Sequence, residues 1–513
     1  MGRDDQEERS RNRAAFRQKI HATMQTLFGE RLIQHAMDPR ASLAIAMPGR
    51  ESSYAELLGR VQTCAGWMVR EGCTRSEVVG ITIGDEFTHL VVTLALLHLG
   101  IPQVCLATHD PLAMRLHLAD RLSVVRTIVT DPRHVLPGRE ALWLTPEILA
   151  AATHDNPRAA VAADPDAPAI YFTSSGTTGQ PKVIALSQRA MSRRAERMSQ
   201  AQALTSVDRT LMLVPVEDYP AKTRRLYSLY LGLTSVLRSP LSSPPLSAQE
   251  LCASLDVTWL ELSVLQASDI VVDCSVHGRL PARTRVFVSG SRVSAKLRHA
   301  FETVVGARLF VNYGAREIGR ITSTYPDNRD EAPETVGRPV PWIALEIVDR
   351  EGRRVPAGEP GEVRVRSEGM IRGYYQDPVA TSRHFKDGWF YPGDAGALTR
   401  GGALCIHGRT DDMMNLHSIK IFPAEIERVL EEHPAVRAAA AFAISSTVHG
   451  DIPVAAVELH HPAKVGVDEL MAWVRERLGV RAPRKIIVLD ALPRNTTGKI
   501  MKRELIGLVV PGS

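Results

Sequence analysis

Short apolar runs alternate with helix-like segments along the N-terminal half of the chain. Residues 78–83 (Val-Val-Gly-Ile-Thr-Ile) and 124–130 have the length and the β-branched content of buried strands. Between them, the apolar segment 90–99 predicts a buried helix that ends at Gly100 and Pro102. Strands that alternate with helices in this way are typical of an α/β fold with a largely parallel sheet.

The pattern changes after the sequence Gly-Arg-Thr-Asp-Asp at 408–412. From there the chain has the patterning of a compact α/β segment of about a hundred residues. We predict helices at 423–432 and 467–478 and strands at 436–444 and 454–459, followed by a basic tail. These elements predict a small, separate C-terminal domain.

The segment 171–182 differs from its surroundings in composition. Serine and threonine hydroxyls and two glycines precede a lysine, and apolar runs at 169–172 and 183–186 flank them. Glycine lets the backbone approach an anion, hydroxyls and exposed N–H groups donate to phosphate oxygens, and lysine adds a positive charge. Such a cluster is ordinarily a solvated linker, but a flexible linker does not join two buried strands. We therefore predict a phosphate-binding loop that uses Thr173, Ser174, Ser175, Gly176, Thr177, Thr178 and Lys182.

The spacing of the glycines excludes a Walker-type phosphate loop. That loop has four residues between its two glycines and opens a helix. Here Gly176 and Gly179 are closer together, and an apolar run of strand type follows Lys182. The loop therefore belongs to another family of phosphate-binding proteins.

The overall composition narrows the range of functions. The chain has 513 residues, of which 44% are hydrophobic and 23% charged, with a net charge of +5, as in an ordinary globular protein. Its basic residues are spread along the chain, whereas a nucleic-acid-binding protein usually clusters them on one face. We therefore expect no nucleic-acid partner, while the mild positive charge suits small anionic ligands.

The cysteines and the apolar segments favour a cytoplasmic protein. None of the six cysteines forms a Cys-x-x-Cys pair and no histidine spacing makes a zinc site, so we interpret them as buried thiols in a reducing compartment. Residues 1–17 are charged and lack the apolar core of a signal peptide. The segment 90–99 is too short to cross a bilayer, so we expect no membrane insertion.

The segment 171–182 closely resembles the phosphate-loop signature of the acyl-adenylate-forming superfamily, which includes acyl- and aryl-CoA ligases, peptide-synthetase adenylation domains and beetle luciferases. The resemblance implies an α/β protein with a large N-terminal domain of doubly wound sheets plus a β-barrel-like subdomain, and a small α+β C-terminal domain. We accordingly expect a charged lead-in at 1–20, a large AMP-binding domain at 21–409 and a small mobile domain at 410–513, with a hinge near Asp411.

A second motif, Asn-Tyr-Gly-Ala-Arg-Glu at 312–317, follows an apolar run. An aromatic ring beside a glycine can stack on a purine, and a glutamate can bind a hard cation, although the tyrosine could instead cap a core. The motif is similar to the superfamily's Tyr-Gly-x-Thr-Glu signature. This implies that Tyr313 lies against adenine and that Glu317, a catalytic residue, binds Mg²⁺ together with Thr177. Further nucleotide contacts are implied for Gly290, Ser291, Asn312 and Gly314.

Arg316 departs from this signature, because the superfamily usually has threonine there. Its guanidinium either clamps the α-phosphate with two hydrogen bonds or points away and weakens the site. We include Arg316 among the predicted nucleotide-binding residues.

Two further motifs are Tyr-Pro-Gly-Asp at 391–394 and the Gly-Arg-Thr-Asp-Asp sequence at 408–412. Taken alone, the first is typical of a turn and the second of a surface charge cluster. Their similarity to superfamily motifs implies that Asp394 accepts hydrogen bonds from both ribose hydroxyls. It also implies that Arg409 reaches the ribose or a phosphate and that Asp411 is the hinge residue.

The sequence Pro-Arg-Asn-Thr-Thr-Gly-Lys at 493–499 resembles the superfamily's catalytic-lysine motif. Taken alone, it is equally typical of a solvated basic terminus. The resemblance implies that Lys499 bridges the substrate carboxylate and the α-phosphate. Asn415 and Ser418 stand where the superfamily often has lysine and glycine, and a glycine at the second position lets the backbone approach a pantetheine arm.

Residues 214–220 (Val-Pro-Val-Glu-Asp-Tyr-Pro) resemble the His-Asn-Tyr-Pro run of aryl-acid-activating members. The resemblance implies a substrate pocket formed by Asp218, Tyr219, Gly314 and Ala315. In amino-acid-activating members an aspartate near this position pairs with the substrate ammonium, so Asp218 favours an amino-bearing acid.

Three basic residues offer a different explanation for the acidic pair Glu217 and Asp218. Lys222, Arg224 and Arg225 follow at helical spacing and could neutralise both acids locally. The sequence does not decide between a substrate contact and this local neutralisation.

Together, these motifs predict an AMP-forming acid–thiol ligase. A carboxylate would attack the α-phosphorus of ATP, pyrophosphate would leave, and a thiol would then take the acyl group from the adenylate. The expected ligands are ATP, Mg²⁺, a small carboxylic acid, and either CoA or the pantetheine of an acyl carrier protein. Two alternatives stay open: a stand-alone adenylating enzyme that loads an amino or aryl acid onto a carrier protein, and a degenerate, non-catalytic nucleotide-binding relative.

Overall fold

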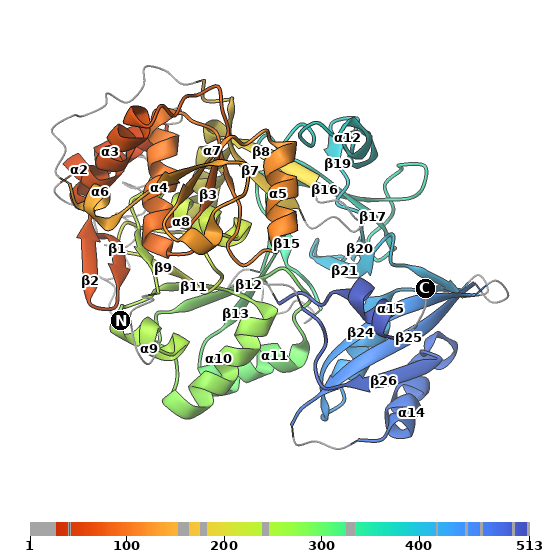
Figure 1. The fold of residues 1–513 in the computed structure, drawn as a ribbon. Coiled ribbons are helices and arrows are strands. Elements are labelled where there is room, and N and C mark those ends of the chain that lie inside the picture. The colour runs from red at the N-terminus through yellow and green to blue at the C-terminus, as the bar shows by residue number, and fades with distance from the viewer. Residues whose placement is uncertain are drawn as a thin grey trace. The chain divides into compact units, whose positions relative to one another are not determined.

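Contacts between Cα atoms in the computed structural model divide the chain into two compact units (Figure 1). The first comprises residues 1–261, 273–286 and 369–381, and the second comprises 262–272, 287–368 and 382–513. Each unit has its own buried core. The residues that the structure describes are 27–38, 41, 43–151, 164–174, 182–238, 246–324, 334–416, 419–446, 450–461, 465–494 and 498–509.

A six-stranded sheet in the first unit has the order β6-β5-β3-β4-β7-β8. Neighbouring strands from β6 to β7 run parallel, and β8 pairs antiparallel with β7. The predicted α/β fold with a largely parallel sheet is thereby confirmed. The strands are β3 (Val79–Thr82), β4 (Gln103–Cys105), β5 (Arg126–Val129), β6 (Glu140–Trp143), β7 (Pro168–Ser174) and β8 (Lys182–Ser187).

Helix α4 (Glu86–Leu99) connects β3 to β4 and packs against α2 (Phe28–Met37) and α3 (Tyr54–Arg70) (Figure 1). It is buried almost all round, which is typical of a helix inside a protein core. The helix begins four residues before the predicted start because the Asp85 side chain accepts a hydrogen bond from the Thr88 amide at 2.8 Å and caps it. Its C-terminus is Gly100, in the left-handed conformation.

Five more strands have the order β11-β9-β10-β1-β2, parallel except for the antiparallel pair β1–β2. They belong to the first unit except for the last two residues of β11. Helices α7 and α8 pack together. The remaining elements of this part of the chain are β1 (Leu43–Met47), β2 (Arg50–Ser53), β9 (Arg209–Met212), β10 (Thr234–Val236), β11 (Trp259–Ser263), α5 (Leu112–Arg121), η1 (Pro132–His134), α6 (Pro146–Ala150), α7 (Gln188–Gln202), α8 (Tyr219–Leu231) and α9 (Ala248–Ser254).

Antiparallel strands dominate the middle of the second unit. A hairpin joins β13 to β14, β15 pairs with β14, and a separate six-stranded sheet has the order β18-β19-β17-β20-β21 with β16 on β17. Helix α10 (Val264–His277) and strand β12 (Arg285–Ser289) contain residues of both units. The other elements are α11 (Ala295–Ala300), η2 (Phe301–Val305), β13 (Leu309–Ala315), β14 (Gly319–Ser323), β15 (Arg338–Pro339), β16 (Ala344–Val348), β17 (Gly361–Arg366), α12 (Pro378–His384), β18 (Phe385–Lys386), β19 (Trp389–Phe390), β20 (Asp394–Leu398) and β21 (Leu404–Arg409).

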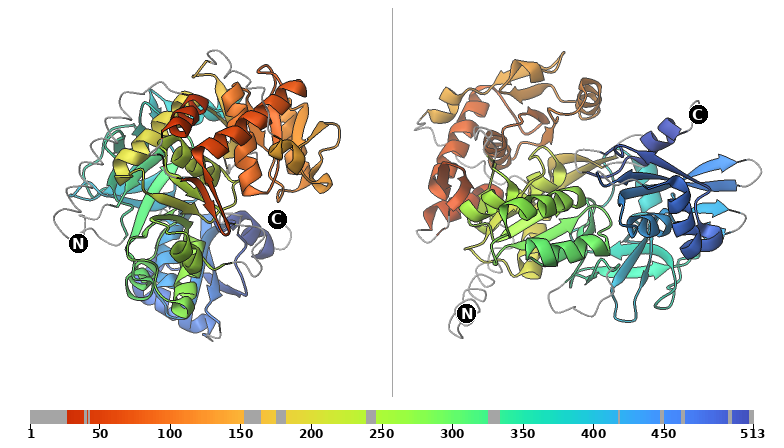
Figure 2. Two further views of the ribbon diagram at one scale, coloured as in Figure 1. Left: turned by 90° about the vertical axis from the view of Figure 1, so that its left-hand side faces the viewer. Right: turned by 90° about the horizontal axis from the view of Figure 1, so that it is seen from below.

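The C-terminal part of the second unit is one five-stranded sheet with helices against it (Figure 2). Strands β23-β22-β25-β24 are consecutive and β26 pairs with β25. The helices and strands predicted at 423–478 are confirmed, with the two strands longer than expected. The elements are β22 (Met414–Leu416), β23 (Ile419–Ile421), α13 (Pro423–Glu431), β24 (Val436–Ser446), β25 (Gly450–Leu459), α14 (Val467–Leu478), η3 (Gly479–Arg481), β26 (Lys485–Leu489) and α15 (Lys502–Val509).

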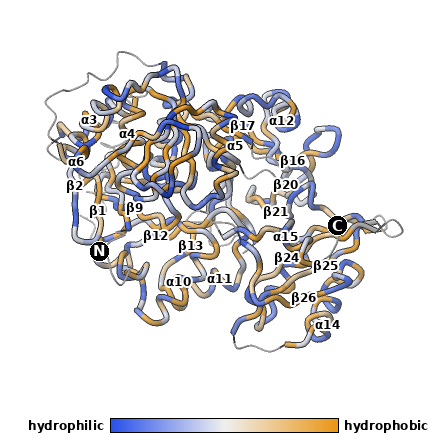
Figure 3. The backbone as a smooth tube through the Cα atoms, viewed as in Figure 1, coloured by the Kyte–Doolittle hydropathy of each residue, from blue (hydrophilic) through white to orange (hydrophobic). Residues whose placement is uncertain are grey.

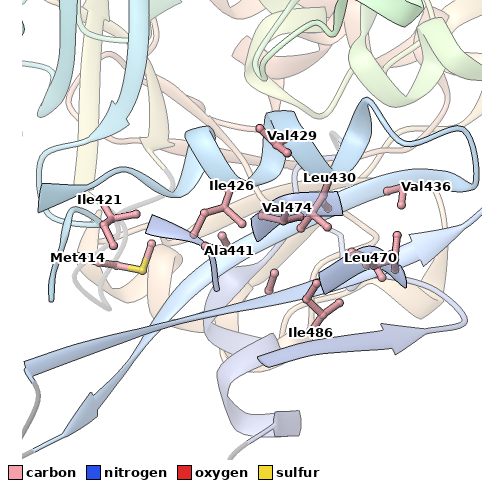
Figure 4. Packing of buried hydrophobic residues seen from close by; sticks show 14 of the residues in the cluster. Met414, Ile421, Ile426, Val429, Leu430, Val436, Ala441, Leu470, Val474 and Ile486 are labelled. Carbon is pink, nitrogen blue, oxygen red and sulfur yellow. The ribbon is translucent and has the colours of Figure 1, made fainter. Parts of the chain in front are cut away.

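Alternate residues of β24 and β25 point to opposite faces of this sheet, and both faces are buried. Ala439, Ala441 and Val457 pack with α13 and α14 in one cluster, part of which Figure 4 shows. Ala440 and Val454 pack in a second cluster that includes Leu505 of α15. Figure 3 accordingly shows hydrophobic colour along both strands. Helices thus cover both faces of the sheet, and packing against one of these faces holds α15 in position.

No helix in the described part of the chain combines the length and the apolar content needed to cross a bilayer.

Candidate active site

Strands β7 and β8 bring the two ends of the predicted phosphate loop together. Ser174 pairs with Lys182 in the antiparallel register, and half-buried Thr173 precedes them. The Lys182 amino group lies 5.0 Å from the centre of the Tyr374 ring. The loop itself, with Ser175, Gly176, Thr177 and Thr178, lies outside the described residues.

Three predicted nucleotide-binding residues of the second unit meet directly. The Tyr313 hydroxyl, on β13, donates a hydrogen bond of 2.5 Å to Oδ2 of Asp394, the first residue of β20. Arg409, at the end of β21, is the sheet partner of Asp394 and approaches its Oδ1 to 3.3 Å. The pairing of β20 with β21 brings Asp394 and Arg409 together, and Tyr313 reaches them from β13, which belongs to another sheet.

A tight turn before Asp394 holds Arg409. Gly393 has φ +81°, and a side chain there would place its Cβ 2.6 Å from Nη2 of Arg409. Arg409 donates from Nη1 to the Pro392 carbonyl at 2.5 Å, and the Thr410 amide donates to the Gly393 carbonyl at 2.9 Å. The motifs at 391–394 and 408–412 therefore form one structure, which their separation in the sequence did not reveal.

Lys499 lies in the electric field of this cluster. Its own desolvation, followed by the charge of Arg409, lowers the pKa of Lys499, and Asp394 opposes the change. Desolvation raises the pKa of Asp394, and the charge of Arg409 opposes this change. Desolvation, followed by the charge of Asp394, holds the pKa of Tyr313 well above its usual value. The charges of Asp394 and Arg409 thus act on both Lys499 and Tyr313.

Main-chain contacts position the segment that carries Lys499. Arg494 and Ile500 form an antiparallel bridge, and the Met501 amide donates to the Pro493 carbonyl at 2.8 Å. Leu492 and Ile500 pack in the same cluster as α15. The segment is therefore fixed to the C-terminal sheet.

The other predicted residues of the second unit lie at strand ends. Glu317 is buried in the turn between β13 and β14, and half-buried Ala315 and Arg316 precede it. Asn312 is buried, and its Oδ1 accepts a 2.6 Å hydrogen bond from the Ser323 hydroxyl. Its Nδ2 has no hydrogen-bond partner among the described residues, so it is free to donate to a ligand. Gly290 and Ser291 are exposed after β12, and Asp411 is exposed with its Oδ1 3.3 Å from Nε of Arg409.

Gly314 is required where it stands. The register of the β13–β14 hairpin shifts between Tyr313 and Gly314, and a Cβ at position 314 would lie 2.4 Å from the Gly319 carbonyl oxygen. Because that neighbour is backbone, the hairpin would have to move, and Tyr313 with it.

We expect Gly314→Ala to lower the free energy of unfolding by about 2 kcal/mol, because overpacking against backbone cannot be relieved by rotating a side chain. Urea denaturation measures this loss. Gly59→Ala, inside helix α3, is the matched control, since no atom lies within 4 Å of its Cβ position and alanine suits a helix interior, so it should not destabilise the protein. Equal stability of the two variants would contradict the steric argument.

Two of the four predicted acid-pocket residues, Asp218 and Tyr219, lie in the first unit at the start of α8, whereas Gly314 and Ala315 belong to the second unit. Asp218 precedes the helix. The Tyr219 hydroxyl accepts a 2.9 Å hydrogen bond from Arg194, and the Tyr219 ring meets Phe172 edge-on at 4.6 Å.

The prediction that basic residues of α8 neutralise Glu217 and Asp218 is wrong for Arg224 and Arg225. Arg224 pairs with Glu261 at 2.7 Å, and Arg225 pairs with Glu86 at 2.8 Å. Glu217 instead accepts hydrogen bonds from the amide and hydroxyl of Thr108 and lies 3.3 Å from Nδ1 of His109.

Comparison with known proteins identifies the family of this arrangement. The model of the AMP-binding enzyme family matches residues 33–375, and the model of the AMP-binding enzyme C-terminal domain matches residues 425–499. The chain is 25% identical to a 4-chlorobenzoate–CoA ligase of Arthrobacter sp. over 475 residues, 89% of this chain and 90% of the relative. It is 30% identical to triostin synthetase I of Streptomyces triostinicus over 502 residues, 91% of this chain and 92% of the relative.

Solved structures share the fold. The O-succinylbenzoate coenzyme A synthetase of Bacillus subtilis, in complex with ATP and magnesium ion, has a TM-score of 0.82 and 23% identity, covering 93% of this chain and 98% of that chain. The expected α/β fold with a large N-terminal part and a smaller C-terminal part is confirmed. Because the first family model covers more than half of the sequence, the chain belongs to the AMP-binding enzyme family, within the acyl-adenylate-forming superfamily that its motifs resemble.

Proposed function

We propose that this protein activates a carboxylic acid with ATP to an acyl-adenylate and then transfers the acyl group to the thiol of CoA. The observation that carries the proposal is the coupled cluster of Tyr313, Asp394, Arg409 and Lys499. The presence of a CoA ligase among the relatives supports CoA as the acceptor.

Asp394 is suited to hold the ribose of ATP. A carboxylate has about four positions that can accept a hydrogen bond. Tyr313 and Arg409 occupy two of these positions on Asp394, so two remain for the ribose hydroxyls. Tyr313 and Arg409 fix the orientation of the carboxylate, and the Tyr313 ring offers a face to the adenine.

Lys499 supplies positive charge where the reaction develops negative charge. As the carboxylate oxygen bonds to the α-phosphorus and the bond to pyrophosphate breaks, charge accumulates on the phosphate oxygens. The mutual effect of the Asp394 and Lys499 charges supports this role, because a lysine close to the proposed ribose site would also be close to the α-phosphate. Lys182 and the loop before it would hold the leaving pyrophosphate.

Glu317 fits a magnesium ion that is bound mainly to the phosphates of ATP. Mg²⁺ usually takes one or two carboxylates and completes its shell with phosphate oxygens and water. No group of three His, Cys, Asp or Glu side chains is placed to hold a metal within the described ranges, so a single buried carboxylate suits this ion better than an all-protein site does. The bound ion would neutralise phosphate charge.

We expect Asp394→Ala to lower kcat/KM for ATP by about 10- to 100-fold, the effect of losing a charged hydrogen-bond acceptor. The decisive measurement compares ATP with 2′-deoxy-ATP and 3′-deoxy-ATP in wild-type and variant enzyme. If Asp394 binds the ribose hydroxyls, the wild-type preference for ATP disappears in the variant. Tyr313→Phe removes only the bond that orients Asp394 and keeps its carboxylate, so it should reduce the preference without abolishing it. A preference unchanged by Asp394→Ala would refute the ribose assignment.

Pyrophosphate exchange into ATP over a panel of aliphatic, aryl and amino acids tests the adenylation step, and thioester formation with CoA tests the second step. Acid-dependent exchange followed by a CoA thioester supports the proposal. Acid-dependent exchange with transfer only to a carrier-protein pantetheine would show that the acceptor is the carrier protein and not CoA. Ser418, which stands where the superfamily often has a glycine beside the pantetheine arm, lies outside the described residues. Absence of acid-dependent exchange for every acid would favour a non-catalytic nucleotide-binding relative.

A further inference from the structure

Glu458 is a buried carboxylate of the C-terminal sheet that the proposed mechanism does not use. It lies on β25 and only 2% of its surface is exposed. Val454 and Ala456, two and four residues earlier on the same strand, pack in the apolar cluster of α15, so Glu458 belongs to that face of the sheet. Burying a carboxylate is costly unless it is paired and hydrogen-bonded, so its partners should show why it is there.

One oxygen of Glu458 is occupied entirely by the segment 492–494. Its Oε2 accepts hydrogen bonds from the Leu492 amide at 3.1 Å and from Nη1 of Arg494 at 2.7 Å. The same Nη1 donates to the Leu492 carbonyl at 3.1 Å. The carboxylate, the guanidinium and the main chain of Leu492 therefore hold one another in a single arrangement.

The segment that Glu458 holds leads directly to Lys499. Arg494 forms an antiparallel bridge with Ile500, and the Met501 amide donates to the Pro493 carbonyl at 2.8 Å. Lys499 immediately precedes Ile500, and consecutive Cα atoms are about 3.8 Å apart. A displacement of Arg494 would therefore be passed through the bridge to the backbone of Lys499.

The two ion pairs of Glu458 differ in their exposure to solvent. Arg494 has 17% of its side chain exposed, and its charge-assisted hydrogen bond is of the strong kind. Arg437, whose Nη1 lies 3.0 Å from Oε1, has 44% exposed, so solvent weakens that pair. A buried ion pair is weak evidence for stability, because apolar residues often stabilise a core equally well. What the Glu458–Arg494 pair adds is a defined geometry at the base of the Lys499 segment.

We propose that Glu458 is a positioning residue for Lys499: by holding Arg494 and the Leu492 amide, it fixes the segment that presents the lysine during adenylation. This inference rests on the proposed function. Only the first half-reaction uses Lys499 in that function, so Glu458 should affect adenylate formation and not the later transfer to CoA.

The test measures the two half-reactions separately in Glu458→Gln, which keeps the shape but removes the charge, and in Arg494→Met. We expect each variant to lower the single-turnover rate of adenylate formation by about 10- to 100-fold with little change in the Kd for ATP, because a catalytic group misplaced by about 1 Å can cost this much. Transfer from a chemically prepared acyl-adenylate to CoA should stay near wild type. Arg437→Ala is the matched control: it removes the exposed partner of the same carboxylate and should leave both rates unchanged.

Two further measurements separate positioning from a purely structural role. In a Lys499→Ala background, Glu458→Gln should lower adenylate formation no further, because a residue that acts through Lys499 has nothing left to position. Hydrogen exchange at the amides of Leu492 and Met501 should be faster in Glu458→Gln than in wild-type protein, and this readout needs no turnover. A thermal unfolding scan verifies that each variant is folded, and Arg494→Met serves if Glu458→Gln is not, because it leaves Glu458 paired with Arg437.

Three results would overturn the inference. They are wild-type adenylate formation in both variants, equal losses in the two half-reactions, and an undiminished effect of Glu458→Gln in the Lys499→Ala background. Failure of the proposed function is distinguishable, because the wild-type enzyme itself would then form no adenylate from any acid. The exchange rates would still report whether Glu458 holds the segment.

Discussion

Replacing Lys499 by alanine should lower the rate of adenylate formation by about 100- to 1,000-fold, with little change in the affinity for ATP. The proposed role of this lysine is to stabilise charge that develops in the transition state, and removal of one such positioned donor typically costs this much. Because the interaction is weaker in the ground state, the loss should appear in kcat rather than in KM. Single-turnover formation of the acyl-adenylate measures the effect.

Lys502→Ala is the matched control for this experiment. Lys502 is three residues away on α15 and forms an ion pair of 2.7 Å with Glu427, so its loss removes the same charge from the same segment. We expect near wild-type adenylation from this variant. Lys499→Ala should also still transfer the acyl group from a chemically prepared acyl-adenylate to CoA. Full adenylation activity in Lys499→Ala would refute the catalytic assignment.

Lys222→Met should make the protein more stable by about 2–3 kcal/mol at pH 7. Desolvation lowers the pKa of Lys222 from 10.5 to about 8, with the neighbouring Cys105 and Glu217 opposing the change. At about 1.4 kcal/mol per pKa unit, the buried charge costs about 3 kcal/mol of folding free energy below pH 8. Methionine has a similar length and removes the charge, so urea unfolding at pH 7 should report the gain.

The pH dependence gives this prediction a definite sign. Between about pH 8 and 10.5, the unfolded chain holds the Lys222 proton while the folded protein has lost it, so the contribution of this group to stability rises with pH. The advantage of Lys222→Met should therefore shrink across this window. Lys485→Met, which removes an exposed lysine, is the control and should show neither the gain at pH 7 nor its loss at high pH. A destabilised Lys222→Met would mean that the lysine makes a structural interaction.

Elements with a strong local pattern could be predicted from the sequence. Runs of apolar residues predict β24 and β25, and Pro423 marks the first residue of α13. The start of α4 could not be predicted from hydropathy because its first turn contains the polar residues Glu86 and His89, which are buried by tertiary contacts. The capping residue Asp85 was the available signal.

Motif order was enough to predict the family, whereas the partners of each side chain depend on distant segments. The bond between Tyr313 and Asp394 joins positions 81 residues apart, and Glu217 finds its donors 109 residues earlier, at Thr108. Helical spacing favoured pairing of Arg225 with the nearby acids, but its carboxylate partner is Glu86, 139 residues away. Spacing along one helix cannot show which neighbour tertiary packing provides.

The attachment of Lys499 to the C-terminal sheet has a consequence for timing. Because main-chain contacts and the packing of Leu492 and Ile500 tie its segment to that sheet, Lys499 cannot leave its place by rotating side-chain bonds alone. Lys499 can therefore leave the site only if the C-terminal sheet moves with it. Collective motions of this size take microseconds to milliseconds, slower than side-chain rotation by several orders of magnitude. The switch from adenylation to thioester formation is therefore expected to occur at the rate of a domain movement.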